Sequence, residues 1–136
     1  MKVKATKDSE AGVIPSEELL TRMGRFNEDL IKAGVLLAGD GLHPSAKGVR
    51  ICFPSGAVTN GPLPENGHLI SGFWLWRVQS MQEAIDWIRR SSFQDFDDGE
   101  VEIHPVFEPD DFGEALTPEL RAQEARIVAE AYRNEA

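Results

Sequence analysis

Asp40 and His43 lie close together in a glycine-rich stretch, and this pair is the first candidate for chemistry in the sequence. A carboxylate beside an imidazole orients the ring and raises its basicity, as general acid–base catalysis requires. The alternative is that Asp40 accepts hydrogen bonds from turn amides while His43 stays half exposed. His68, just before an aromatic segment, is the third candidate catalytic residue, and a solvent-facing loop histidine is its alternative.

Three further side chains could contact a ligand. Trp74 and Trp76 alternate along one expected strand and could stack on a ligand, although aromatic residues at this spacing more often belong to a core or an interface. Arg50, on another expected strand, could bind an anionic group, and a solvated strand charge explains it equally well.

Metal and disulfide chemistry find little support. Cys52 is the single cysteine of the sequence, so no disulfide can form within it, and its apolar surroundings at 49–53 indicate a strand residue. The three histidines are dispersed and lack the spacing of a metal site. We therefore expect no metal and no cofactor.

Helices must position these residues. Ser16 is a suitable N-cap, apolar residues recur at helical spacing from Leu19 to Ile31, and Gly34 can end the helix, which predicts a helix over 16–33. A second helix begins with the capping sequence at Ser80, and a third opens at Thr117 and Pro118. The thin apolar stripe of the third helix is expected to dock either on its own chain or on a partner subunit.

Strands are expected between these helices. Residues 35–38 read as a buried strand, and the glycines and proline of 39–44 predict a turn or bulge after it. The remaining strands are expected at 1–7, 48–53, 57–59, 70–78 and 101–107, with 57–59 pairing back on 48–53 as a hairpin. This order predicts an α+β fold of the ferredoxin-like βαββαβ type, with an extra hairpin strand and a C-terminal helix.

The strand at 70–78 is apolar on both faces. Trp74 and Trp76 point one way, and Phe73 and Leu75 point the other. One face must meet helices of its own subunit, and a domain this small has little left to cover the second. We therefore expect a homodimer that buries one sheet face.

Composition limits the possible partners. The sequence has 136 residues, enough for one domain, and a net charge of −9. Such an acidic chain lacks the basic surface that nucleic acid or an anionic membrane would attract. No apolar run is long enough to cross a bilayer and the first residues do not resemble a signal peptide, so we expect a cytoplasmic protein.

Several segments together resemble one family, the YCII-related proteins with an Asp-Gly-Pro-Phe signature. These segments are 4–12, 33–44, 59–63, 72–76 and 107–120, which run in order over nearly the whole chain. The resemblance implies a ferredoxin-like fold and a dimer of the α/β-barrel type, built on the open sheet faces. It also implies a domain over 1–107 and a C-terminal loop and helical extension over 108–136.

The chain departs from the family at its signature. The motif usually reads Asp-Gly-Pro-Phe-Ala-Glu-Thr-Lys-Glu, and here Asn60-Gly61-Pro62-Leu63 begins the corresponding segment. Glu65 keeps the motif carboxylate, and the resemblance makes Asn60 and Glu65 candidate ligand-binding residues. Two functions stay open: a non-catalytic small-molecule-binding or regulatory homodimer, or a cofactor-independent isomerase or lyase acting on a small organic substrate through Asp40, His43 and His68.

Overall fold

The computed structural model describes residues 1–64 and 67–134 and has a mixed α+β fold with antiparallel sheets. Its strands are β1 (Lys2–Lys4), β2 (Leu36–Gly41), β3 (Val49–Cys52), β4 (Ala57–Asn60), β5 (Ile70–Trp76) and β6 (Val101–Glu102). Its helices are α1 (Lys7–Glu10), α2 (Glu17–Lys32), α3 (Met81–Ile88) and α4 (Pro118–Asn134). Short 3₁₀ segments cover Ser45–Lys47, Ser92–Asp95 and Pro109–Ala115. None of the described helices is long and apolar enough to cross a membrane.

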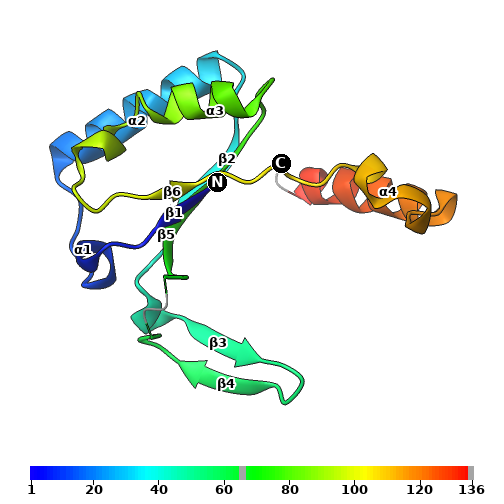
Figure 1. The fold of residues 1–136 in the computed structure, drawn as a ribbon, viewed down its shortest axis with the longest axis horizontal. Helices are drawn as coiled ribbons and strands as arrows, with labels where there is room; N and C mark the ends of the chain where they lie inside the picture. The colour runs from blue at the N-terminus through cyan, green and yellow to red at the C-terminus, as the bar shows by residue number, and fades with distance from the viewer. Residues whose placement is uncertain (65–66, 135–136) are drawn as a thin grey trace. The chain divides into compact units, whose positions relative to one another are not determined.

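Contacts divide the chain into two units, Met1–His104 and Pro105–Ala136. In the first unit, four antiparallel strands form a sheet in the order β2-β5-β1-β6, while β3 and β4 form a separate two-stranded sheet (Figure 1). In the second unit, Phe107 stacks on Phe112 with ring centroids 5.1 Å apart, and Arg121 of α4 pairs with Asp110 at 3.1 Å.

Helix α2 begins and ends where the sequence predicts. The Ser16 side chain accepts a hydrogen bond from the Leu19 amide at 3.1 Å and so caps the first turn. At the other end, the amides of Gly34 and Val35 donate to the carbonyls of Ile31 and Leu30, a pairing that satisfies the last turn. Leu30 and Val35 are both buried, so this helix end is anchored in the core.

An aromatic cluster joins the helices to one face of the sheet. The ring of Phe26 on α2 lies 5.9 Å from Trp74, 6.1 Å from Trp76 and 6.4 Å from Trp87 of α3, measured between centroids. Trp74 also packs edge-on against Phe93 at 5.7 Å. Trp74 and Trp76 therefore lie on the helix-covered face of β5, and Phe73 and Leu75 lie on the open face.

Several expected strands differ from those observed. The strand expected at 1–7 ends at Lys4, because Thr6 caps a helical turn and Lys7–Glu10 form α1. Gly39 and Asp40 belong to β2 and pair with Trp74 and Phe73, so the turn predicted at 39–44 is wrong over its first three residues. The glycine at 39 meets a packing requirement, since a Cβ atom there would lie 2.4 Å from Cδ1 of Trp74. The last strand was expected to reach residue 107, and it ends at Glu102, which pairs with Lys2, the first residue of β1.

Substituting Gly39 with alanine should destabilise the first unit, because the added methyl group must displace a tryptophan ring held in the aromatic cluster. The overpacking is expected to cost about 1–3 kcal/mol of unfolding free energy, measured by urea denaturation. Gly41→Ala is the matched control, since a Cβ at Gly41 meets nothing within 4 Å. Equal stability of the two variants would contradict this account of the strand.

Candidate functional site

Three distant segments meet at the end of the sheet where β1 and β2 finish and β5 begins. Glu10 is the last residue of α1. One of its carboxylate oxygens accepts a hydrogen bond from the Ser45 amide at 2.9 Å, and the other accepts one from the Ser45 hydroxyl. The Ser45 hydroxyl oxygen in turn accepts the Leu63 amide at 3.0 Å. We call this set of contacts the Glu10–Ser45–Leu63 clamp.

Helix α1 is positioned by its own capping box. Thr6 and Ser9 exchange hydrogen bonds, the Ser9 amide donating to the Thr6 hydroxyl at 3.1 Å and the Thr6 amide donating to the Ser9 hydroxyl at 2.8 Å. This reciprocal pairing fixes a helix of four residues that would not persist alone. It thereby presents the Glu10 carboxylate to the segment after β2.

Gly61 brings the signature segment against the clamp. Its amide donates to the Gly48 carbonyl at 2.9 Å, and a Cβ atom at this position would lie 1.7 Å from the Ser45 carbonyl oxygen. Any side chain would therefore push the two backbones apart. The Ser45 hydroxyl donates one hydrogen bond to the Glu10 carboxylate and accepts another from the Leu63 amide. The clamp therefore holds the loops together, and this hydroxyl is already used as both donor and acceptor.

The three candidate catalytic residues lie near this end of the sheet without touching. Asp40 is exposed on β2, where it faces the same side as its partner Phe73. His43 follows β2, His68 precedes β5, and both are exposed. Over residues 1–64 and 67–134, no hydrogen bond or ion pair joins any two of Asp40, His43 and His68.

The candidate ligand-binding residues do not share one surface. Trp74 is buried and Trp76 half-buried within the aromatic cluster, beneath the helices. Arg50 is half-buried on β3 opposite Thr59, and Asn60 is exposed at the end of β4. Glu65 lies outside the described residues.

A charged network occupies the open face of the sheet. The Glu102 carboxylate on β6 forms ion pairs with Lys2 at 2.9 Å and Lys4 at 3.4 Å, and it contacts the His104 ring at 3.3 Å. Lys4 also pairs with Glu100 at 2.9 Å. The strand register places Glu102, Lys2, Phe73 and Asp40 in one row across the four strands. This row combines charges of both signs with an exposed aromatic ring.

The network shifts the ionisation of its members. Hydrogen bonds from Lys2 and then His104 lower the pKa of Glu102 from its ordinary 4.5 to about 2. The hydrogen bond to Glu100 raises the pKa of Lys4 above its ordinary value. Both residues are charged over the physiological range, which suits ion pairing better than proton transfer. Within the described part of the chain, no group of three or more His, Cys, Asp or Glu residues is arranged to hold a metal ion.

Sequence reasoning missed both the clamp and the charged network. Ser45 and Leu63 enter the clamp partly or wholly through backbone amides, which leave no trace in residue type. Alternation of Glu100, Glu102 and His104 with the apolar Val101 and Ile103 was the available signal for the network.

Comparison with protein families finds a match over most of the chain. The family model of the YCII-related domain matches residues 3–110. This range includes the clamp and every residue of the four-stranded sheet except Lys2. A search of curated proteins finds none that matches this chain.

Replacing Glu102 with glutamine should remove a pH-dependent part of the stability. Since the pKa of Glu102 is lower in the folded state, its carboxylate stabilises the fold above about pH 4.5, and this contribution is lost as the pH falls towards 2. Urea denaturation should show Glu102→Gln less stable than the unaltered protein near neutral pH, with the gap closing near pH 2.

The control for this substitution is Glu28→Gln on α2, a carboxylate without an ion pair among the described residues. It should leave the stability nearly unchanged at both pH values. A gap for Glu102→Gln that persists undiminished in acid would show that the charge of Glu102 is not what stabilises the sheet.

Proposed function

The chain belongs to the YCII-related domain family, and from this premise we propose that it acts as a homodimer with a non-catalytic small-molecule-binding or regulatory role. The domain we propose is ferredoxin-like. The antiparallel strand order β2-β5-β1-β6, with α2 linking β1 to β2 and α3 linking β5 to β6, supports that assignment.

The proposed homodimer is supported mainly by the open face of the sheet. Helices cover the face with Trp74 and Trp76, while Phe73 on the other face is 38% exposed beside the half-buried Leu75. The same face carries Lys2 and Glu102, so a two-fold axis could set the cation of one copy opposite the anion of the other. A second copy of the chain fits this mixture of apolar and self-complementary charged groups.

The β3–β4 hairpin supplies further apolar surface. Its strands pair only with each other, and four large apolar residues are more than half exposed: Val49, Ile51, Phe53 and Val58. An isolated two-stranded hairpin is at best marginally stable in water. Contact with the second subunit would cover these side chains, so we place the hairpin at the edge of the dimer interface.

The scatter of the polar candidates supports a role without catalysis. General acid–base work needs its groups within hydrogen-bonding reach of a common reactant, and Asp40, His43 and His68 are exposed and unconnected. The signature aspartate is replaced by Asn60, which removes a carboxylate from the motif. The net charge of −9 argues against nucleic acid or an anionic membrane as the partner.

A cofactor-independent isomerase or lyase is the alternative. It is favoured by one observation, that His43 and His68 flank the paired ends of β2 and β5, where the Leu42 amide donates to the Ser71 carbonyl at 2.8 Å. Dimerisation would have to enclose both histidines with Asp40 to complete such a site.

Phe73→Glu should convert the homodimer into a folded monomer, because it places a carboxylate in the buried apolar part of the interface. Sedimentation at micromolar concentration should show a dimer for the unaltered protein and half that mass for the variant, with unchanged circular dichroism. Ile31→Glu is the control, since Ile31 is 62% exposed on α2, on the helix side of the sheet. A monomeric unaltered protein would refute the proposed assembly.

Histidine labelling separates the two functions. Diethyl pyrocarbonate, read out by peptide mass spectrometry, should label His43 and His68 readily in the dimer and label His104 slowly, because His104 lies on the open face. In the Phe73→Glu monomer all three should react. Protection of both His43 and His68 in the dimer, lost in the monomer, would favour the enclosed catalytic site of an enzyme.

A further inference from the structure

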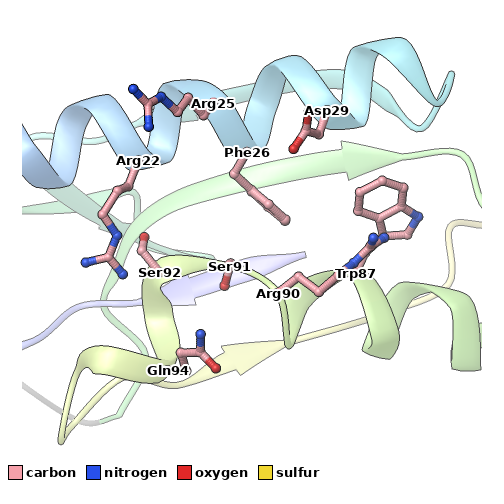
Figure 2. Close-up of a pocket in the computed structure, with 9 residues that line it drawn as sticks. All are labelled: Arg22, Arg25, Phe26, Asp29, Trp87, Arg90, Ser91, Ser92 and Gln94. Atoms are coloured by element: carbon pink, nitrogen blue, oxygen red, sulfur yellow. The ribbon is translucent and has the colours of Figure 1, made fainter.

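A groove of about 360 Å³ runs between α2, α3 and the 3₁₀ segment Ser92–Asp95, apart from the residues considered above as catalytic. Figure 2 shows Phe26 pointing from α2 into the space between the elements, with Trp87 and Arg90 towards one end and Arg22, Ser92 and Gln94 towards the other. The volume falls within the range of small-molecule sites. The groove thus joins an aromatic wall to a set of hydrogen-bond donors.

Arg90 packs against Trp87 in this aromatic wall. Its guanidinium carbon lies 3.7 Å from the centre of the Trp87 ring, a cation–π contact that fixes the plane of the guanidinium group. Across residues 1–64 and 67–134, Arg90 makes no ion pair, whereas Arg22 at the other end is neutralised by Asp95. A guanidinium stacked on its face keeps the donors along its edge available, and their forked geometry matches a carboxylate.

Ser92 offers a second polar contact from within the groove. It is 8% exposed, and its hydroxyl takes no part in any hydrogen bond among the described residues. The neighbouring Ser91 is different, because its hydroxyl donates to the Ile88 carbonyl at 2.6 Å and accepts the Phe93 amide at 3.3 Å. Ser91 therefore holds the turn in place, and Ser92 is left for a ligand.

We propose that this groove binds a small aromatic carboxylate. The carboxylate would pair with the edge of the Arg90 guanidinium, and the ring would pack against Phe26 and the edge of Trp87, whose face Arg90 covers. Three arginines and one carboxylate, Asp29, line the groove, and Arg22 is paired with Asp95, so the local charge is positive and favours an anion although the net charge of the protein is −9. The site lies within one subunit, so it does not depend on the proposed homodimer.

Benzoate is the probe for this site, used with the full-length chain. Titration followed by two-dimensional NMR should shift the indole N–H signal of Trp87 saturably. Benzamide, which has the same shape without the charge, should bind at least about tenfold more weakly. No saturable shift with benzoate, or equal binding of benzamide, would overturn the proposal.

Variants assign the contact to Arg90. Arg90→Gln should weaken benzoate binding at least about tenfold, and Arg90→Lys, which keeps the charge but loses the fork, should fall between it and the unaltered protein. Arg89→Gln is the matched control, because Arg89 is exposed, adjacent in sequence and outside the groove. Benzoate binding that is undiminished in Arg90→Gln or Arg90→Lys, or reduced equally in Arg89→Gln, would show that the forked contact to Arg90 is not formed.

Discussion

The packing of Phe26 against Trp74 is the contact on which the first unit depends. Buried large apolar side chains are few among the described residues, and Trp74, at 9% exposure, is the largest of them. It contacts α2 through Phe26, the segment after α3 through Phe93, and β2 at Gly39, where the absence of a side chain admits the ring. One indole therefore sets the distance of α2, and of the segment that follows α3, from the sheet. A core this small leaves the opposite face of the four-stranded sheet without a covering helix among the described elements of Met1–His104.

The two faces of the sheet consequently have different chemistry. On the helix face, aromatic rings exclude water and carry most of the burial energy. On the open face, Glu102 collects two lysines and a histidine at distances of 2.9–3.4 Å while Phe73 stays accessible. Exposed ion pairs add little to stability by themselves. Their value rises once water is displaced, since charges brought together in a lower dielectric attract more strongly, and a second subunit would provide that displacement.

Local signals in the sequence were enough for most elements. The Ser16 cap and helical spacing predicted 16–33 against an observed Glu17–Lys32, and the alternation of Trp74 with Phe73 correctly separated the two faces of β5. The errors came from tertiary contacts. Glycines at 39 and 41 resembled a turn, but Gly39 is a packing requirement of Trp74. Of the site, only single residues could be predicted, because the clamp joins the side chains of Glu10 and Ser45, which are 35 residues apart, to a backbone amide of Leu63.

The clamp also explains how the signature segment tolerates its altered residues. Gly61 cannot accept a side chain beside the Ser45 carbonyl, and Leu63 enters the clamp only through its amide. The geometry of the loop therefore rests on Gly61, which like Pro62 matches the Asp-Gly-Pro-Phe signature that the segment resembles, while the two residues that differ, Asn60 and Leu63, differ in side chains that the clamp does not use. Such a pattern keeps the loop in place while changing the groups it presents. A protein that needed the signature carboxylate for chemistry would lose its activity by this exchange, whereas one that needed only the shape of the loop for binding or assembly would keep its function.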